Sequence, residues 1–251
     1  MRSGQRYVLM PKFLTVVEFV YIGNNVWFTD KFLCYADGMQ IIPAIVGETF
    51  AEVKEKLEKV KGLVEWVQID VVDGTFAEPA SWGSHIGDNL HLWEPLELPK
   101  IEMHLMVQNP SVWLDDWAST SVDRIVMHAE SDGDKKALIE RLKKLGTQIG
   151  MALKLETPID VLEPYAKDLD VVELMSIETI GSYGALFSEK VFEKISVVRN
   201  KYPNVIIEVD GGVNMDNARK LIDAGVNNLV VGSAIWKAGD ITSTINEFKK
   251  I

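Results

Sequence analysis

Acidic residues and one histidine stand at the ends of short apolar runs, where side chains leave a strand and can face a shared pocket. Asp70 and Asp210 each end such a run, and His104 lies near the end of a third. Gln68 precedes Asp70 by two residues, and side chains two apart on a strand share a face. Two opposed carboxylates can remove a proton from one face of a carbon and return one to the other. An isolated Asp is more often a cap, but this combination favours acid–base chemistry on a small molecule.

Glycines follow the last two apolar runs. Gly211 and Gly212 precede a predicted helix, and Gly232 and Ser233 follow the final run. Glycine lets the backbone approach a ligand closely, and a helix N-terminus favours an anion. Either pair alone is typical of a turn. Both pairs at these loops favour a phosphorylated small substrate.

Eight short apolar or β-branched runs must position these residues. We predict strands over residues 40–46, 64–70, 100–106, 124–128, 148–153, 171–175, 206–209 and 229–231. Five of the seven intervals between strand starts are 23 or 24 residues, about enough for one strand, one helix and two loops. Amphipathic stretches predict helices over residues 49–60, 134–145, 188–201 and 215–224.

Eight evenly spaced units predict a single α/β domain that closes into a TIM (β/α)8 barrel. An open doubly wound sheet is the alternative, which the even spacing and the lack of a GxGxxG motif disfavour. The two long intervals follow the second and sixth strands. We expect residues 74–98 to build a wall of the pocket and residues 178–186 to form a flap.

Residues 1–38 are rich in aromatic side chains and lack a clean period. We therefore predict an N-terminal extension over residues 1–38 and a barrel over residues 39–251. The extension's apolar stretch at residues 13–20 is interrupted by Glu18 and is shorter than the roughly 20 residues that a membrane span needs. An oligomerisation arm or a lid is the functional alternative to an appended segment.

Composition narrows the class of protein. The chain has 251 residues, a formal net charge of −11 and a single cysteine, Cys34. The negative charge argues against nucleic acid as the main partner, and one cysteine excludes an internal disulfide. We expect a cytoplasmic enzyme that has no membrane or nucleic-acid partner and forms a homo-oligomer.

Six motifs, in order along the chain, resemble the ribulose-phosphate 3-epimerase family. They are IPAI at residues 42–45, QIDVVDG at 68–74, HLM at 104–106, MS at 175–176, DGGV at 210–213 and GSA at 232–234. Each motif alone is weak, but the ordered set at strand ends is specific. The resemblance covers the chain from about residue 40 to the C-terminus.

The resemblance implies a TIM barrel that interconverts D-ribulose 5-phosphate and D-xylulose 5-phosphate. It implies that Asp70 and Asp210 are the acid–base pair around an enediolate. It also implies a divalent metal (Zn, Mn, Fe or Mg) held by Asp70, His104 and Asp210, with Gln68 as a further candidate. The substrate residues that it implies are Met106, Met175, Gly184, Gly212, Gly232 and Ser233.

The chain departs from the family pattern at several positions. Gln68 stands where the family has a histidine ligand, Val72 replaces a methionine and Ala44 replaces a serine. The segment ETIGSYGA at residues 178–185 replaces NPGFGGQ. An amide oxygen is a poor substitute for imidazole toward Zn²⁺, so Gln68 weakens the metal prediction or shifts it toward Mn²⁺ or Mg²⁺.

Two functional interpretations follow. The first is an active epimerase of the pentulose phosphate or of another ketose phosphate, which the retained aspartates and His104 favour. The second is a non-catalytic or repurposed barrel that binds a phosphorylated ligand. Lys154 could serve a Schiff-base aldolase, which is a minor alternative. His128 is either a substrate contact or a wall residue of the barrel.

Overall fold

The computed structural model describes residues 39–84, 99–114, 120, 122–181 and 184–251, together with the backbone of three strands between residues 3 and 35. The chain divides into two compact units, Met1–Met39 and Gln40–Ile251. In the first unit, β1 (Ser3–Met10), β2 (Phe13–Ile22) and β3 (Asn25–Tyr35) form an antiparallel sheet in that order. β-Branched and aromatic residues, which favour extended backbone, dominate β2.

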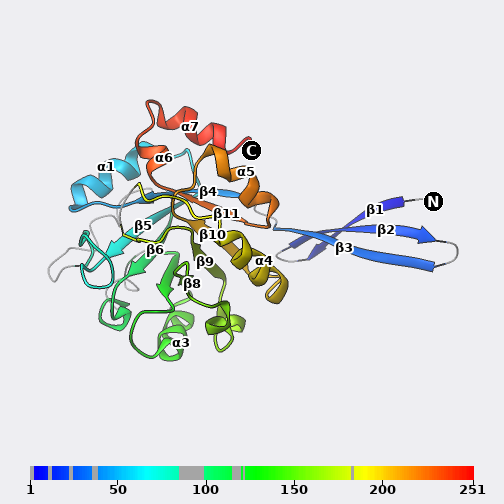
Figure 1. Cartoon of the computed structure of the whole chain (residues 1–251), viewed down its shortest axis with the longest axis horizontal. Helices are drawn as coiled ribbons and strands as arrows, with labels where there is room; N and C mark the ends of the chain where they lie inside the picture. The colour runs from blue at the N-terminus through cyan, green and yellow to red at the C-terminus, as the bar shows by residue number, and fades with distance from the viewer. Residues whose placement is uncertain are drawn as a thin grey trace. The chain divides into compact units, whose positions relative to one another are not determined.

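The second unit is a closed ring of eight parallel strands (Figure 1). Around the ring the order is β10 (Ile206–Asp210), β11 (Asn228–Val231), β4 (Gln40–Ile45), β5 (Trp66–Val72), β6 (Lys100–Met106), β7 (Arg124–His128), β8 (Gln148–Leu153) and β9 (Val171–Met175). The last strand, β11, pairs with the first, β4, and β9 pairs with β10. The predicted TIM barrel is confirmed.

Strand positions agree with the spacing argument to within two residues. The second barrel strand begins at Trp66 rather than at residue 64. The reason is a turn after the preceding helix, in which Leu63 N donates to Val60 O and Gly62 has a φ of +73°. Only after this turn does the backbone extend.

Helices lie outside the ring of strands (Figure 1). They are α1 (Phe50–Val60), α3 (Lys135–Leu145), α4 (Val191–Lys201), α5 (Met215–Asp223), α6 (Ser233–Trp236) and α7 (Ile241–Phe248). Thr49, Asp134, Asn214 and Asp240 cap four of them by accepting backbone N–H bonds. Short 3₁₀ turns, η2 (Ile159–Leu162) and η3 (Ala166–Asp168), occupy the β8–β9 connection. Among the described residues, none of the helices is long and apolar enough to cross a bilayer.

Apolar and polar side chains alternate along the barrel strands. In β5, Val67, Ile69 and Val71 are buried apolar residues, whereas Gln68 and Asp70 carry the polar side chains between them. β6 repeats the pattern with Glu102 and His104. The barrel interior therefore holds polar groups at two levels. The upper level, which includes Asp70 and His104, forms the site, and the lower level includes Glu102.

Candidate active site

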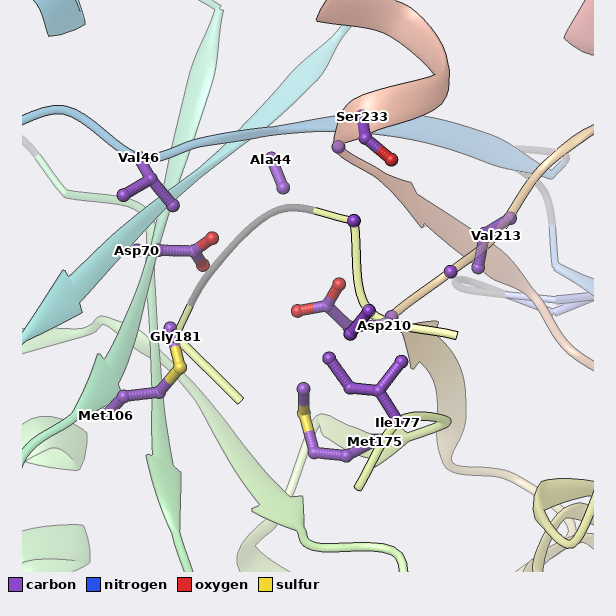
Figure 2. Close-up of a pocket in the computed structure, with 15 residues that line it drawn as sticks. Ala44, Val46, Asp70, Met106, Met175, Ile177, Gly181, Asp210, Val213 and Ser233 are labelled. Atoms are coloured by element: carbon purple, nitrogen blue, oxygen red, sulfur yellow. The ribbon is translucent and has the colours of Figure 1, made fainter. Parts of the chain in front are cut away.

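A pocket opens at the carboxyl ends of the barrel strands (Figure 2). Its lining includes Asp70 from β5 and Asp210 from β10, which come from strands separated by β11 and β4. The same pocket is lined by all six residues predicted to bind substrate, namely Met106, Met175, Gly184, Gly212, Gly232 and Ser233. The structure thus brings together predicted site residues that are up to 163 positions apart in the chain (233 − 70).

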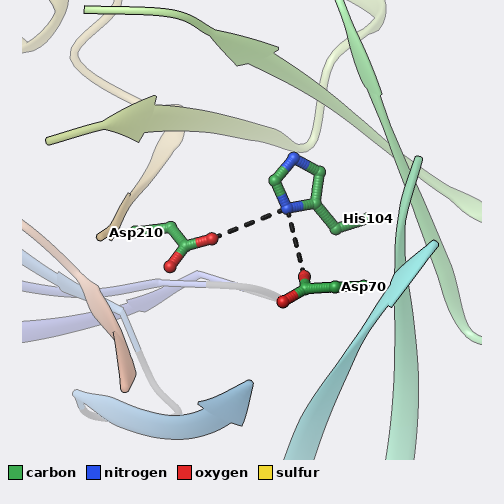
Figure 3. A group of neighbouring side chains, drawn as sticks. All are labelled: Asp70, His104 and Asp210. Carbon is green, nitrogen blue, oxygen red and sulfur yellow. Dashed lines mark ion pairs between the residues drawn. The ribbon is translucent and has the colours of Figure 1, made fainter. Parts of the chain in front are cut away.

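Asp70 and Asp210, which line this pocket, converge with the buried His104 (Figure 3). His104 Nδ1 lies 3.4 Å from Asp70 Oδ1 and 3.6 Å from Asp210 Oδ2. One potential ligand atom of each residue lies within 4.8 Å of the other two. His104 is fully buried, while the two carboxylates keep slight exposure toward the pocket.

Gln68 lies among these three residues. Its Nε2 is 2.8 Å from Asp70 Oδ1, 3.1 Å from Asp210 Oδ2 and 3.2 Å from His104 Nδ1. The amide group has two hydrogens, so it can satisfy at most two of the three acceptors at once. Its Oε1 is buried and has no hydrogen-bond partner among the described residues.

Burial and charge shift the pKa values of this cluster. Burial raises the pKa of Asp70, and the nearby charge of Asp210 adds to the rise, although bonds to His104 and Gln68 oppose it. Burial alone would lower the pKa of His104. The charge of Glu173 and the carboxylates of Asp210 and Asp70 outweigh it, so the pKa of His104 lies well above its usual value.

His128 lies behind His104 rather than in the pocket. The two Nε2 atoms are 2.9 Å apart, and both rings are fully buried. His128 Nδ1 lies 3.1 Å from Glu130 Oε2. Burial lowers the pKa of His128 to about 4. For Glu130, bonds from His128 and Thr157 outweigh the effect of burial and lower the pKa to about 2. Of the two interpretations of His128, the geometry favours the wall residue.

A second polar level lies deeper in the barrel. Arg124 Nη1 donates to Glu102 Oε2 and to Glu208 Oε1, each at 2.6 Å. Asn228 Nδ2 also donates to Glu208 Oε1, at 2.7 Å. Burial, followed by the charge of Glu208, raises the pKa of Glu102 to about 8. Burial lowers the pKa of Arg124, but the charges of Glu208 and Glu102 reverse this, so the guanidinium stays charged.

Glu173 lies between the two levels. Its Oε1 is 3.1 Å from His104 Nδ1, yet neither oxygen makes a well-formed hydrogen bond to any described group. Burial raises its pKa well above the usual value, against the opposing charge of His104.

Two serines fix the backbone beneath the aspartates. Ser176 N donates to Asp210 O at 2.7 Å, and its hydroxyl donates to the same oxygen at 3.0 Å. Ser81 Oγ donates to Asp70 O and accepts from Val72 N, both at 2.9 Å. Ser81 belongs to the loop after β5, and no sequence signal pointed to it.

The loops after β9, β10 and β11 form the glycine-rich side of the pocket. Gly212 has a φ of +66°, and a Cβ there would lie 2.8 Å from Phe187 N, so the close approach requires glycine. Gly232 and Ser233 begin the short helix α6. Lys237 Nζ lies 3.4 Å from the point that a Cβ on Gly184 would occupy. Sequence reasoning missed this lysine, which adds a positive charge beside the glycines.

Apolar residues cover the other side of the pocket. A buried cluster joins the β5 and β9 loops to two strand-end methionines; its members are Val72, Ala77, Met106, Met175, Ile177 and Ile180. Gly181 approaches the loop after β5 so closely that a Cβ would lie 3.0 Å from Glu78 O. The described part of the predicted wall and part of the predicted flap therefore pack together here. Residues 85–98 of the wall and residues 182–183 of the flap lie outside the described residues.

Lys154 does not line the pocket. Its Nζ lies over the ring of Phe76, 3.8 Å from the centroid. A Schiff-base nucleophile must reach the substrate carbonyl, so this placement disfavours the aldolase interpretation.

The donor set of the upper cluster suits a divalent cation. Two carboxylates and one imidazole, each with an atom within 4.8 Å of the others, match the ligands that Mn²⁺, Fe²⁺, Zn²⁺ and Mg²⁺ take in proteins. Gln68 fits only if its amide turns over, because amide hydrogens repel a cation. Such a turn would point Oε1, which has no hydrogen-bond partner among the described residues, toward a cation held by the carboxylates, and the cation would then be its partner.

Comparison with known proteins assigns the family. The model of the ribulose-phosphate 3 epimerase family matches residues 40–236. The chain belongs to this family. The predicted resemblance is confirmed, and with it the isomerase class of enzyme.

Epimerase relatives come from several kingdoms. Ribulose-phosphate 3-epimerase of Bacillus subtilis is 31% identical over 217 residues, which cover 84% of this chain and 98% of the relative. The chloroplastic ribulose-5-phosphate-3-epimerase of Arabidopsis thaliana is 32% identical over 83% of this chain and 75% of its own length. The epimerase of Schizosaccharomyces pombe is 29% identical over 79% and 87% of the two chains.

Solved structures with lower identity share the fold. The 3-hexulose-6-phosphate synthase of Salmonella typhimurium has a TM-score of 0.65 at 13% identity, covering 84% of this chain and 97% of its own. A tryptophan synthase α-subunit from Pyrococcus furiosus has a TM-score of 0.63 at 15% identity, covering 85% and 99%. At these identities the likeness establishes the barrel architecture of this epimerase-family chain and no more.

Proposed function

We propose that this protein interconverts D-ribulose 5-phosphate and D-xylulose 5-phosphate through an enediolate. The observation that carries the proposal is the convergence of Asp70 and Asp210 on one pocket, each with a carboxylate oxygen within 4.8 Å of the other. Carboxylates from separate strands can flank a substrate carbon, which inversion of a stereocentre requires. The family relationship supplies the reaction class.

In this proposal the two aspartates exchange roles with the direction of the reaction. One carboxylate removes the proton from C3 of the ketose, and the protonated carboxyl of the other delivers a proton to the opposite face. Burial raises the pKa of Asp70, which favours the protonated carboxyl that this role needs. In the reverse direction Asp70 becomes the base, so both groups regain their starting states after each round trip.

The candidate ligands of a divalent metal are Asp70, His104, Asp210 and, after its amide turns, Gln68. A bound divalent cation would polarise the substrate carbonyl and stabilise the developing negative charge. Because Gln68 offers oxygen instead of imidazole nitrogen, we propose that Mn²⁺ or Mg²⁺ is favoured over Zn²⁺ more than in relatives that have a histidine there.

The remaining predicted residues bind the substrate in this proposal. Gly184, Gly212, Gly232 and Ser233 receive the phosphate through backbone N–H groups, and Lys237 lies close enough to Gly184 to add charge. Met106 and Met175 belong to the apolar cluster and face the pocket, where they exclude water from the enediolate.

We further propose that residues 39–251 form the catalytic unit and residues 1–38 an appended extension. The net charge of −11 and the single cysteine support a cytoplasmic protein. Assembly into a homo-oligomer stays a prediction.

The deciding experiment is an epimerase assay coupled to a xylulose 5-phosphate-consuming enzyme. The protein is stripped of metal and assayed with Zn²⁺, Mn²⁺, Mg²⁺ and Fe²⁺ in turn. We expect turnover with at least one cation and its loss in Asp210→Asn, while circular dichroism shows an intact fold. Asp223→Asn, an exposed residue at the end of α5, is the matched control and should keep full activity. No turnover with any of the four ions contradicts the proposal.

A further inference from the structure

We propose that Glu130 and His128 are positioning residues that keep the proton of His104 on Nε2 and so leave Nδ1 free to bind a cation. This inference rests on the proposed function, because it concerns the ring nitrogen that faces the two aspartates. Neither residue lines the pocket, so neither acts by touching substrate.

The residues form a continuous chain of polar contacts behind the site. His104 Nδ1 faces the two aspartates at 3.4 and 3.6 Å, with Glu173 Oε1 at 3.1 Å and Gln68 Nε2 at 3.2 Å from the same nitrogen. Its Nε2 lies 2.9 Å from His128 Nε2. The planes of the two rings differ by only 20°. His128 Nδ1 in turn lies 3.1 Å from Glu130 Oε2. The chain ends on Glu130 Oε1, which accepts from Lys154 N at 2.8 Å and from the hydroxyl of Thr157.

Once a cation binds His104 Nδ1, these contacts place the ring protons of both histidines. When His104 Nδ1 binds a cation it carries no proton, so the neutral ring must carry its proton on Nε2. Two facing nitrogens 2.9 Å apart share one proton, so His128 Nε2 is the acceptor. The proton of His128 is then on Nδ1, and a carboxylate, which only accepts, is the partner that this arrangement needs. Glu130 supplies that partner.

Replacing Glu130 with glutamine reverses this order. Lys154 N is a backbone donor, so the oxygen of the substituted amide must stay at the position of Oε1. The amide nitrogen must then face His128 Nδ1 and donate to it. His128 is forced to carry its proton on Nε2, His104 Nε2 becomes the acceptor, and the proton of His104 moves to Nδ1. A protonated Nδ1 cannot bind a metal.

The test compares the wild-type protein with Glu130→Gln in two measurements that need no turnover. Nitrogen-15 NMR of the imidazoles reports which nitrogen carries each proton, and calorimetric titration with Mn²⁺ reports metal affinity. We expect the proton of His128 to move from Nδ1 to Nε2 and Mn²⁺ affinity to fall roughly 10- to 100-fold. In the epimerase assay, Glu130→Gln should lower kcat strongly and should change KM for the sugar phosphate only slightly. Glu156→Gln, the same change at a neighbouring exposed residue, should leave all readouts unchanged.

A second pair of variants keeps the inference testable if Glu130→Gln does not fold. In His128→Gln the side-chain oxygen can accept from His104 and the nitrogen can donate to Glu130, which preserves the polarity of the chain. His128→Phe preserves bulk and removes both contacts. We expect His128→Gln to bind Mn²⁺ at least tenfold more tightly than His128→Phe.

Several outcomes would overturn the inference. They are a Glu130→Gln protein with wild-type Mn²⁺ affinity, an unmoved His128 proton, equal affinities of the two His128 variants, or a wild-type protein that binds no Mn²⁺. A wild-type protein that binds Mn²⁺ but does not epimerise ribulose 5-phosphate contradicts the proposed function alone. The ring-proton and affinity shifts would then still support the role of Glu130.

Discussion

The two polar levels of the barrel interior differ in how their charges are balanced. At the lower level Arg124 lies between Glu102 and Glu208, and Asn228 donates to the same Glu208 oxygen as Arg124. At the upper level Asp70 and Asp210 share one amide group. The lower level is buried and holds its own cation, Arg124, although Glu102 Oε1 and Glu208 Oε2 have no hydrogen-bond partner among the described residues. The upper level opens on the pocket.

This difference shows where a ligand can add stabilisation. A buried charge without a partner costs several kcal/mol, so the lower level needs its internal arginine. The upper level carries two carboxylates that a proton, a cation or a polarised substrate can balance. We therefore expect catalysis at the upper level, where protein groups alone do not balance the charges of the two carboxylates.

The largest expected effect separates the two levels by activity. Asp70→Asn should lower kcat about 10³-fold, because it removes a proton-transfer group. Glu208→Gln should keep kcat within a few-fold, because the amide oxygen can still accept from Arg124. The coupled epimerase assay measures both. Equal losses in the two variants would break the contrast.

Stability should show the opposite pattern. Arg124→Met leaves Glu102 and Glu208 buried without their cation and should lower the free energy of unfolding by about 3–5 kcal/mol. Urea denaturation measures the change, with Arg219→Met, at an exposed position of α5, as the control. A cost below about 1 kcal/mol would show that the lower level does not depend on its arginine.

Gln68→His tests whether position 68 belongs to the metal site of the upper level. Imidazole replaces an amide whose donors face the candidate ligands, so Zn²⁺ affinity should rise about tenfold. Gln68→Leu removes the same donors without adding a ligand and should not reproduce the gain. Calorimetric titration separates the two cases, and unchanged affinity in Gln68→His would argue against this position as part of the metal site.

The lower level also predicts a pH dependence of stability. The pKa of Glu102 is about 8 in the folded protein, above its ordinary value of 4.5. Between these values the folded state binds more protons than the unfolded state, so stability falls as pH rises through this window. The loss is at most about 1.4 kcal/mol per pH unit for one group.

Glu102→Gln cannot lose a proton, so its free energy of unfolding should fall less between pH 6 and pH 8. Chemical denaturation at several pH values measures the slopes. Glu58→Gln, at an exposed position of α1, should keep the wild-type slope. Identical slopes in all three proteins would contradict the raised pKa of Glu102.

The barrel could be predicted from sequence because its determinants are local. A near-constant interval between apolar runs encodes one strand and one crossover, and capping residues such as Thr49 and Asp134 begin the helices. The placement of Asp70 and Asp210 also follows from local alternation, since side chains at strand ends face one mouth. The sheet of β1–β3 was not predicted, because its strands lack a clean alternation.

The partners of the site residues could not be predicted, because they depend on register between strands. The pairing of Asp70 with His104 across β5 and β6 aligns two side chains that the sequence separates by 34 residues. The contact between His104 and His128 requires the stagger of a third strand. Gln68 was expected to be a weak ligand, and its role as a donor to both aspartates appeared only with its amide in place.

The pairing of β11 with β4 has a consequence for biosynthesis. The first barrel strand to leave the ribosome keeps an open hydrogen-bonding edge until residues Asn228–Val231 emerge and complete the ring. Until that moment water can reach the carboxylates inside the nascent barrel. Dehydration of these charges therefore coincides with the end of translation of the domain, and a chain that stalls earlier would expose an unpaired strand to its neighbours or to chaperones.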